Sequence, residues 1–319
     1  MNNEMTADQM LISGINALKE KKILEAEKIF KLLLQKKPMN PDVNHLLGIT
    51  FQLLNKVDEA IVSYKESIKI KPDFVEAHNH LGNILYGLGK IEEAEPCFKK
   101  AVELKPEFTE AKTILNIILQ QKKVLSKIKY SKCHIKNKKV PVVKLSSNPF
   151  ITMRDVESKL ITTLYKMKSI KLEKTKDIRY GNGKCSPDLK LFESDFFIIK
   201  TLKKDLINIM KQSVASEVYV VESFFNILSS GSGTTPHRHL EPFDKAYKIA
   251  NQKYSLVYYL AVGDQNCSEP GILKLYDPDD KILPAKGSVV IIPASRKHSA
   301  IYNGKIDRIM IGVNFYSLI

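Results

Sequence analysis

The sequence has no tryptophan and only four cysteines among its 319 residues. The cysteines stand far apart, form no CxxC pair and show no framework spacing; they are Cys97, Cys133, Cys185 and Cys267. Scattered cysteines of this kind argue against a disulfide-stapled fold. We therefore expect the protein to work in a reducing, cytoplasmic setting.

Long apolar runs and a basic leader are missing as well. No run of about 18 apolar residues occurs, so we expect no membrane-spanning helix. Residues 1–10 are polar, contain Glu4 and Asp8 and lack the basic start of a signal peptide, so we expect none there. The glycine turn at residues 181–183 lacks the strand and helix flanks of a phosphate-binding loop.

The formal net charge of +15 is unevenly placed. Basic residues outnumber acidic ones by 21 to 9 in residues 127–217, by 18 to 17 in residues 1–126 and by 11 to 9 in residues 218–319. A basic block can bind nucleic acid, an anionic membrane or an acidic partner. Its lysines lie among helix-like stretches without the aromatic and glycine pattern of an RNA-binding motif, which favours a solvated surface. We expect neither nucleic acid nor a membrane as partner.

Residues 1 to about 126 repeat themselves at a step of 34 residues. The series are Gly14, Gly48 and Gly82; Ala26, Ala60 and Ala94; Phe30, Tyr64 and Phe98; and Pro38, Pro72 and Pro106. We interpret each unit as two antiparallel helices, in which the small residues allow close approach and an aromatic ring fills the gap between units. Proline ends the second helix. A further helix over residues 107–126 is expected to cap the stack.

With Leu47-Gly48 and Leu81-Gly82 at the seventh and eighth positions of their units, this region resembles the tetratricopeptide repeat. The resemblance implies an α-helical solenoid whose concave groove binds a protein or peptide partner. Candidate groove residues are Asn44, His78 and Asn79. A spacer or dimerisation arm is the alternative, because three repeats form a short groove.

Residues 127–150 are basic and end in the turn formers Ser146, Ser147, Asn148 and Pro149, which indicates a linker with a short strand at residues 140–144. Apolar residues at three- and four-residue steps then predict helices over residues 155–168 and 200–216. From residue 217 onward, β-prone segments are separated by Gly, Pro, Asn and Asp. The expected strands are 218–221, 224–228, 254–262, 272–276, 288–292, 298–302 and 308–316. Several short strands separated by turn residues are typical of a β-sandwich or jelly roll.

His237 and His239 are one residue apart, and His298 follows on a later expected strand. Side chains alternate along a strand, so the first two histidines face the same side and can hold one ion. A third imidazole would leave the remaining metal positions open to a cosubstrate, dioxygen or water, as in non-haem iron oxygenases. The alternative is that an HxH pair in a loop binds nothing.

Six motifs appear in order: Pro236-His237-Arg238-His239, residues 254–260, Gly271-Ile272-Leu273, residues 284–293, His298 and residues 308–315. This succession resembles the iron(II)- and 2-oxoglutarate-dependent oxygenase superfamily. It is most similar to members with an HxH pair and a tyrosine-rich strand, some of them fused to tetratricopeptide repeats. The resemblance covers about residues 218–319 and implies a double-stranded β-helix, or jelly roll, that uses Fe(II) with 2-oxoglutarate as cosubstrate.

By this resemblance, His237 and His298 take the places of the first and the distal histidine ligand. Arg308 falls ten positions after His298, where the superfamily has a basic residue that binds the far carboxylate of 2-oxoglutarate. A guanidinium fork matches a carboxylate in shape and charge. One hydroxyl of the pair Tyr258-Tyr259 could bind the same carboxylate. A structural arginine paired with Asp307 is the alternative.

His239 stands where the superfamily usually has a carboxylate. Three arrangements follow: a site of His237, His239 and His298; a shifted site of His239, Glu241 and His298; or a site that has lost iron. A neutral imidazole removes one negative charge from the metal's ligands, which should weaken iron binding. The HxH pair of the similar proteins favours the three-histidine site, with Glu241 as the substitute ligand.

The sequence thus predicts a multidomain α + β protein. Repeats with a capping helix occupy residues 1–126, a basic linker 127–150, and an oxygenase-like jelly roll with supporting helices 151–319, its core being 218–319. The expected function is Fe(II)- and 2-oxoglutarate-dependent hydroxylation of a protein, peptide or small molecule, with dioxygen as the other cosubstrate. The metal ligands are His237, His239 and His298, Arg308 binds 2-oxoglutarate, and no catalytic residue is expected beyond the metal site. The alternative is a non-catalytic repeat scaffold with a degenerate oxygenase-like or cupin-like barrel.

Overall fold

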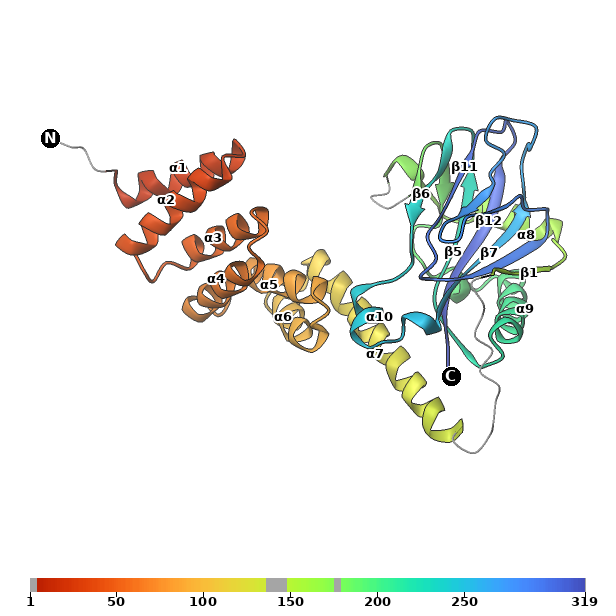
Figure 1. Cartoon of the computed structure of the whole chain (residues 1–319), viewed down its shortest axis with the longest axis horizontal. Helices are drawn as coiled ribbons and strands as arrows, with labels where there is room; N and C mark the ends of the chain where they lie inside the picture. The colour runs from red at the N-terminus through yellow and green to blue at the C-terminus, as the bar shows by residue number, and fades with distance from the viewer. Residues whose placement is uncertain (1–4, 136–147, 175–178, 319) are drawn as a thin grey trace. The chain divides into compact units, whose positions relative to one another are not determined.

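The computed structural model describes residues 5–135, 148–174 and 179–318. The chain separates into two compact units, Met1–Gln121 and Lys122–Ile319. The first unit is helical and the second is rich in strands (Figure 1). The boundary between them falls within helix α7 (Thr109–Ile135).

Three helix pairs make up most of the helical unit. The pairs are α1 (Ala7–Lys19) with α2 (Ile23–Lys36), α3 (Pro41–Leu53) with α4 (Val57–Ile70), and α5 (Val75–Gly87) with α6 (Ile91–Leu104). Thr6 and Gln9 form a capping box at the start of α1, and the Asn40 side chain accepts a hydrogen bond from the Val43 backbone at the start of α3. Each pair ends two residues before a proline of the repeat, as the sequence predicts.

The glycine and aromatic series of the repeat meet inside each helix pair. An ideal Cβ on the glycine would lie 2.5, 2.6 and 2.9 Å from the ring in the pairs Gly14–Phe30, Gly48–Tyr64 and Gly82–Phe98. Only glycine therefore lets the two helices of a pair approach this closely. The rings also reach the next unit, since Tyr64 stacks on His80 with ring centroids 5.6 Å apart.

Two of the candidate groove residues are interior residues. Asn44 and Asn79 are only 8% and 2% exposed, and the Asn44 amide donates to the backbone oxygen of Asn40. The groove assignment is therefore wrong for these two, because a small polar residue on the inner side of a helix has no pattern that distinguishes it from a groove residue.

The capping helix differs in length from its prediction. Helix α7 continues to Ile135, into the segment expected to be a linker, and the strand expected at residues 140–144 lies outside the described residues.

Two antiparallel sheets form the framework of the second unit. In the part of the chain that the structure describes, the larger sheet has the order β1-β10-β7-β12-β5-β4-β2 and the smaller β3-β6-β11-β8-β9. The strands are β1 (Phe150–Met153), β2 (Ile170–Lys171), β3 (Arg179–Tyr180), β4 (Gly183–Cys185), β5 (Val218–Leu228), β6 (Ser232–His237), β7 (Lys253–Ala261), β8 (Leu273–Leu275), β9 (Asp280–Ile282), β10 (Ser288–Pro293), β11 (His298–Tyr302) and β12 (Arg308–Ser317).

The longer strands agree with the sequence and the shortest ones do not. The five strands expected from residue 254 onward lie within one residue of β7, β8, β10, β11 and β12, whereas the segments 218–221 and 224–228 form one continuous strand, β5. The strands β1, β2, β3, β4 and β9 are not predicted, because two to four residues carry too little alternation to be seen. The six-residue strand β6 is not predicted either, because Gly233 and Pro236 interrupt its β-prone pattern.

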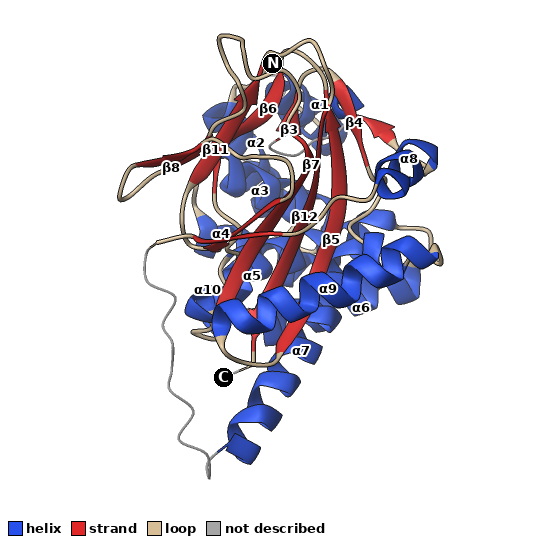
Figure 2. Ribbon diagram, turned by 90° about the vertical axis from the view of Figure 1, so that its right-hand side faces the viewer, coloured by secondary structure: helices blue, strands red, loops and turns tan. Residues whose placement is uncertain are grey.

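Helices α8 (Ser158–Lys166) and α9 (Phe197–Val214) belong to the same hydrophobic core as the larger sheet, and α9 crosses its strands (Figure 2). Leu202 and Leu206 of α9 pack with Phe225 and Ile227 of β5. These sheet residues have odd numbers, so the even-numbered residues of β5 point to the other face, toward the smaller sheet. Every helix in the described ranges is too short or too polar to cross a lipid bilayer.

The glycine of the repeat gives a first prediction. In Gly48→Ala the new Cβ would meet the Tyr64 ring at 2.6 Å, so we expect a loss of about 1–3 kcal/mol in unfolding free energy. Gly87→Ala is the matched control, because nothing lies within 4 Å of that position, and alanine there should stabilise the helix by up to about 1 kcal/mol. Urea unfolding followed by circular dichroism at the helix band measures both. Equal stabilities would contradict the packing argument.

Candidate metal centre

Strand register brings two of the predicted histidines together. β6 ends at His237 and β11 begins at His298, and the ladder pairs these two residues directly. Directly opposed side chains in an antiparallel pair have Cβ atoms about 4.5–5.5 Å apart. The two rings accordingly lie with their centroids 4.3 Å apart.

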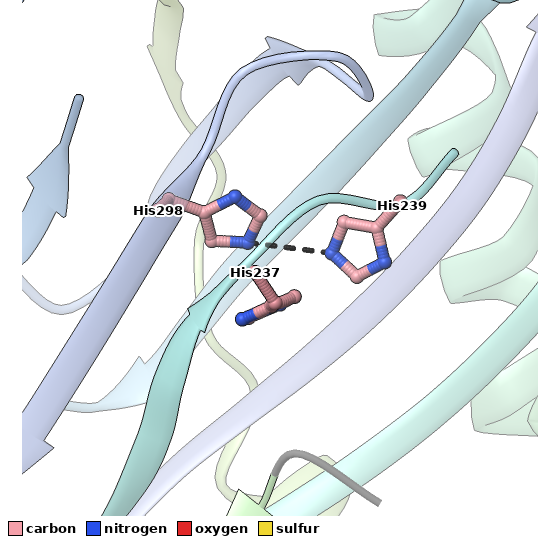
Figure 3. A group of neighbouring side chains, drawn as sticks. All are labelled: His237, His239 and His298. Atoms are coloured by element: carbon pink, nitrogen blue, oxygen red, sulfur yellow. Dashed lines mark hydrogen bonds between the residues drawn. The ribbon is translucent and has the colours of Figure 1, made fainter. Parts of the chain in front are cut away.

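His239 joins them from the segment between β6 and α10 (Pro242–Ala246). Its backbone N–H donates to the backbone oxygen of Ala294 at 2.9 Å. Ala294 directly follows β10, so this hydrogen bond fixes the His239 segment to the end of that strand. Its Nε2 lies 3.3 Å from Nε2 of His298 (Figure 3). One candidate ligand atom from each of the three rings lies within 4.8 Å of the others. The structure thus gathers His237, His239 and His298 into one group.

Backbone oxygens set the tautomers of two of the rings. Nδ1 of His237 lies 2.7 Å from the oxygen of Thr235, and Nδ1 of His298 lies 3.1 Å from the oxygen of Arg296. A carbonyl oxygen can only accept, so each Nδ1 carries the hydrogen and each Nε2 keeps its lone pair. This is the form in which a histidine binds a metal through Nε2.

The site also favours neutral imidazole over imidazolium. Burial lowers the pKa of His298 to about 4, and the nearby His237 adds to this effect. Burial likewise lowers the pKa of His239 well below its usual range. Metal binding requires the neutral ring, so these nitrogens stay available at pH values where an exposed histidine is partly protonated.

The spacing and type of the donor atoms fit a metal ion. Nitrogens about 2.1 Å from one ion, at angles of about 90° to 110°, lie about 3.0–3.4 Å apart. The Nε2 atoms of His239 and His298 have this separation, at 3.3 Å. Imidazole donors suit iron, zinc, copper or nickel better than magnesium or calcium.

Glu241, the alternative ligand, lies elsewhere. Its side chain caps the N-terminus of α10 in a capping box with Asp244, and its Oε1 lies 3.4 Å from Nζ of Lys253. Among the described residues, it does not belong to the metal-ligand group. The carboxylate therefore stabilises the start of a helix, and the shifted HxE arrangement is not the one that this structure adopts.

Arg308 begins β12 and has no exposed surface. Its Nη1 donates to the backbone oxygen of Pro270 at 3.1 Å, and its guanidinium lies 4.9 Å from the ring centroid of Tyr259 and 5.9 Å from that of Tyr302. Its Nε and Nη2 are buried and have no hydrogen-bond partner among the described residues. A buried donor without an acceptor costs about 1–3 kcal/mol, so this guanidinium is incomplete without a ligand.

Asp307 has partners other than Arg308. The carboxylate of Asp307 accepts hydrogen bonds from the hydroxyls of Tyr165 at 2.7 Å and Ser229 at 2.9 Å. An anion that enters the site would therefore be the natural partner of the two free N–H groups, and a carboxylate matches their geometry.

Gly271 and the tyrosine pair complete the surroundings of the guanidinium. Gly271 has a φ of +81°, and an ideal Cβ there would lie 1.5 Å from Nη1 of Arg308. Tyr259 faces Arg308, whereas the Tyr258 hydroxyl donates to the backbone oxygen of Asp155 on the other side of the sheet. Because side chains alternate along β7, Tyr259 and not Tyr258 is the tyrosine of the pair that lies beside Arg308.

A cavity of about 260 Å³ lies between the two sheets and contains the three histidines in its wall. Its apolar walls include Phe224, Val257 and Met310. Tyr259 also lines it, and the centroid of the Tyr259 ring lies 4.9 Å from the Arg308 guanidinium. Other polar residues that line it are Arg179, Glu222, Asn226, Thr234, Ser255 and Asn314. An apolar cavity beside metal ligands limits water and strengthens the electrostatic interactions inside.

Sequence reasoning names none of these six polar residues as part of a site, and two of them, Glu222 and Asn314, pair across neighbouring strands. Asn314 lies six residues after Arg308 on β12, so period-two alternation places both on the same face. Glu222 is the one charged residue of β5. Both signals are present in the sequence, but neither has meaning until the register shows that these two residues face each other.

Comparison with known proteins identifies the repeats. Residues 51–89 match the family model described as TPR repeat, and residues 75–108 match the model described as Tetratricopeptide repeat. The chain therefore contains tetratricopeptide repeats, followed by a sheet-rich region. No curated protein matches the chain significantly.

Among solved structures, the second TPR domain of the human RPAP3 protein, in complex with an HSP70 peptide, is 22% identical with a TM-score of 0.34. The match covers 35% of this chain and 93% of that one. The Arabidopsis OM64 TPR domain is 20% identical with a TM-score of 0.34, again over 35% of this chain and 93% of that one.

The lowered pKa of His298 gives a pH-dependent prediction for the metal-free protein. Between pH 6.5 and about 4, the unfolded chain binds a proton at this residue that the folded chain does not, so the unfolding free energy falls as the pH falls. Between pH 7 and pH 5, the unfolding free energy of wild type should fall by about 1–2 kcal/mol more than that of His298→Leu. Hydrogen exchange of the β12 amides, with a chelator present, measures the opening of this unit. A pH-independent difference would contradict the burial of a neutral ring.

Proposed function

We propose that the second unit is a jelly-roll, or double-stranded β-helix, dioxygenase that depends on Fe(II) and 2-oxoglutarate and hydroxylates its substrate. In this proposal His237, His239 and His298 hold the iron, and Arg308 binds the far carboxylate of 2-oxoglutarate. The tetratricopeptide repeats bind a protein or peptide and recruit or orient the substrate.

The observation that carries this proposal is the incomplete guanidinium of Arg308. A fully buried cation with two unpartnered N–H groups is costly unless an anion completes it. The Arg308 guanidinium lies 4.9 Å from the ring centroid of Tyr259, and Tyr259 lines a cavity whose wall also holds three imidazoles with candidate ligand atoms within 4.8 Å of one another. A ligand with one carboxylate for the arginine and a chelating end for the metal would satisfy both.

Each residue has a distinct task in the proposed reaction. Bound iron and 2-oxoglutarate supply the oxidising chemistry, in which dioxygen hydroxylates a substrate carbon and 2-oxoglutarate becomes succinate and carbon dioxide. The imidazoles orient the metal, Arg308 fixes one end of the cosubstrate, and the apolar wall of Phe224, Val257 and Met310 keeps water away from the reacting atoms.

The repeat unit supports a separate binding role. Its stacked helix pairs resemble modules that hold an extended peptide or a helix. Its charge is nearly balanced, with 18 basic and 17 acidic residues in positions 1–126, so shape and apolar contact should count for more than long-range attraction. A protein scaffold with a degenerate barrel is the competing function, and the following experiment separates the two.

Anaerobic titration of metal-stripped protein with Fe(II) and 2-oxoglutarate should produce the visible metal-to-ligand charge-transfer band of the chelate. His298→Ala should abolish the band, because a ligand is lost. Arg308→Met should leave iron binding intact and weaken 2-oxoglutarate binding by roughly ten-fold or more, since one charge-assisted pair is worth about 1.5–3 kcal/mol. No band in folded wild type would overturn the proposal and favour the scaffold.

Gly271→Ala tests the same carboxylate site without changing the arginine. Its Cβ would displace the guanidinium, so we expect weaker 2-oxoglutarate binding at unchanged iron affinity. Gly231→Ala is the matched control, because its φ of +79° imposes a similar backbone penalty while its nearest atom is 3.9 Å away. Equal 2-oxoglutarate affinities for the two variants would show that the position of Arg308 does not matter.

A further inference from the structure

The third histidine differs from the other two in what its second ring nitrogen touches. Nδ1 of His237 and of His298 faces a backbone oxygen, whereas Nδ1 of His239 lies 3.3 Å from Nδ2 of the Asn314 side chain. Asn314 is 3% exposed and sits on β12 between Glu222 of β5 and Ser255 of β7. The tautomer of His239 thus depends on a side chain, whereas the tautomers of His237 and His298 depend on backbone oxygens.

The orientation of that amide decides whether His239 can bind a metal. A metal on Nε2 requires the hydrogen to be on Nδ1, and Nδ1–H then needs an acceptor. The amide nitrogen of Asn314 is a donor, so in the observed orientation it suits the opposite tautomer. The amide oxygen, Oδ1, is buried and has no hydrogen-bond partner among the described residues.

We propose that Asn314 is the positioning residue of the third metal ligand. When a divalent cation occupies the three histidines, the Asn314 amide turns half a turn about its Cβ–Cγ bond, and Oδ1 accepts the hydrogen of Nδ1 of His239. The inference rests on the metal-binding part of the proposed function and needs neither 2-oxoglutarate nor hydroxylation.

Glu222 stabilises the amide in both orientations. As observed, Nδ2 of Asn314 donates to Oε2 of Glu222. After the half turn, two oxygens face each other, and the acid form of Glu222 supplies the hydrogen between them. Burial raises the pKa of Glu222, although the hydrogen bond from Asn314 opposes this, so the acid form is less unfavourable here than in an exposed glutamate.

A purely structural role for Asn314 leaves its contacts unexplained. An amide that only fills space between strands would have both of its polar atoms satisfied, as most buried side chains do. Here one atom contacts a metal-ligand ring and a buried carboxylate, while the other has no partner among the described residues. The half turn exchanges the two atoms: Oδ1 then faces His239 and Glu222, and Nδ2 takes the position that has no partner among the described residues. The side chain can therefore match either tautomer of His239.

Metal affinity in three variants tests the assignment. Metal-stripped full-length wild type, Asn314→Leu, Asn314→Asp and Asn226→Leu are titrated with Co(II) alone, whose visible spectrum reports binding. Asn314→Leu removes the acceptor and should bind roughly 10–100-fold more weakly. Asn314→Asp keeps an acceptor and should bind at least as tightly as wild type. Asn226 is the matched control, a buried asparagine of the same cavity whose Oδ1 accepts from Arg179, and its variant should bind as wild type does.

Wild-type affinity in Asn314→Leu would overturn the proposal. So would an equal loss in Asn314→Asp and Asn314→Leu, because packing and not hydrogen-bond acceptance would then explain the effect. Thermal unfolding of the metal-free proteins shows whether each variant folds.

A measurement on wild type keeps the proposal testable if Asn314→Leu does not fold. Nitrogen-15 spectra of the Zn(II)-loaded protein should show His239 with its hydrogen on Nδ1 and the metal on Nε2. The reverse tautomer would overturn the inference. Wild type that binds no divalent metal would overturn both this inference and the proposed function, whereas metal binding without a 2-oxoglutarate chelate would overturn the proposed function alone.

Discussion

The pairing of β12 with β5 on one side and β7 on the other is the constraint on which the cavity depends. Because side chains alternate, this ladder sends Arg308, Met310, Gly312 and Asn314 to one face of the sheet. Arg308 meets Tyr259 at one end of the row, and Asn314 meets His239 at the other. One strand therefore carries both the anchor for an anion and a contact to the metal-ligand group, and a slip of one residue would turn both away from the cavity.

The three-histidine group depends in turn on the smaller sheet. His237 and His298 are far apart in sequence and become neighbours only because β6 and β11 pair in one register. An ideal Cβ at Gly233 would lie 2.4 Å from the backbone oxygen of Ala300, so glycine permits the close approach of these two strands. The donor atoms are thus held by backbone geometry, which is the condition for a preorganised site.

Local patterns predict most of the elements and the candidate ligands, and long-range pairing decides the rest. The repeat can be predicted from the sequence because each helix pair contacts mainly its neighbours. The residue types at the positions of Gly48 and Tyr64 therefore recur at a fixed step. His237, His298 and Arg308 are readable from residue type and order. Asn314 and Glu222 are not, because their role depends on a cross-strand contact that no local pattern encodes. The short strands are not predicted because two to four residues carry too little alternation. Glu241 is a wrong candidate because a carboxylate near histidines can equally well cap a helix.

The two charged requirements of the cavity are complementary. The Nε and Nη2 atoms of Arg308 lack an acceptor among the described residues, and Nε2 of His237 and of His298 presents a lone pair that can bind a cation. Backbone oxygens keep Nε2 of His237 and His298 free of hydrogen, which is the form that a metal ligand requires. A divalent metal with a chelating dicarboxylate brings both missing charges in one assembly. Under the proposed function, the second carboxylate of the chelate would meet this buried cation, so binding of the cosubstrate would not depend on the metal alone.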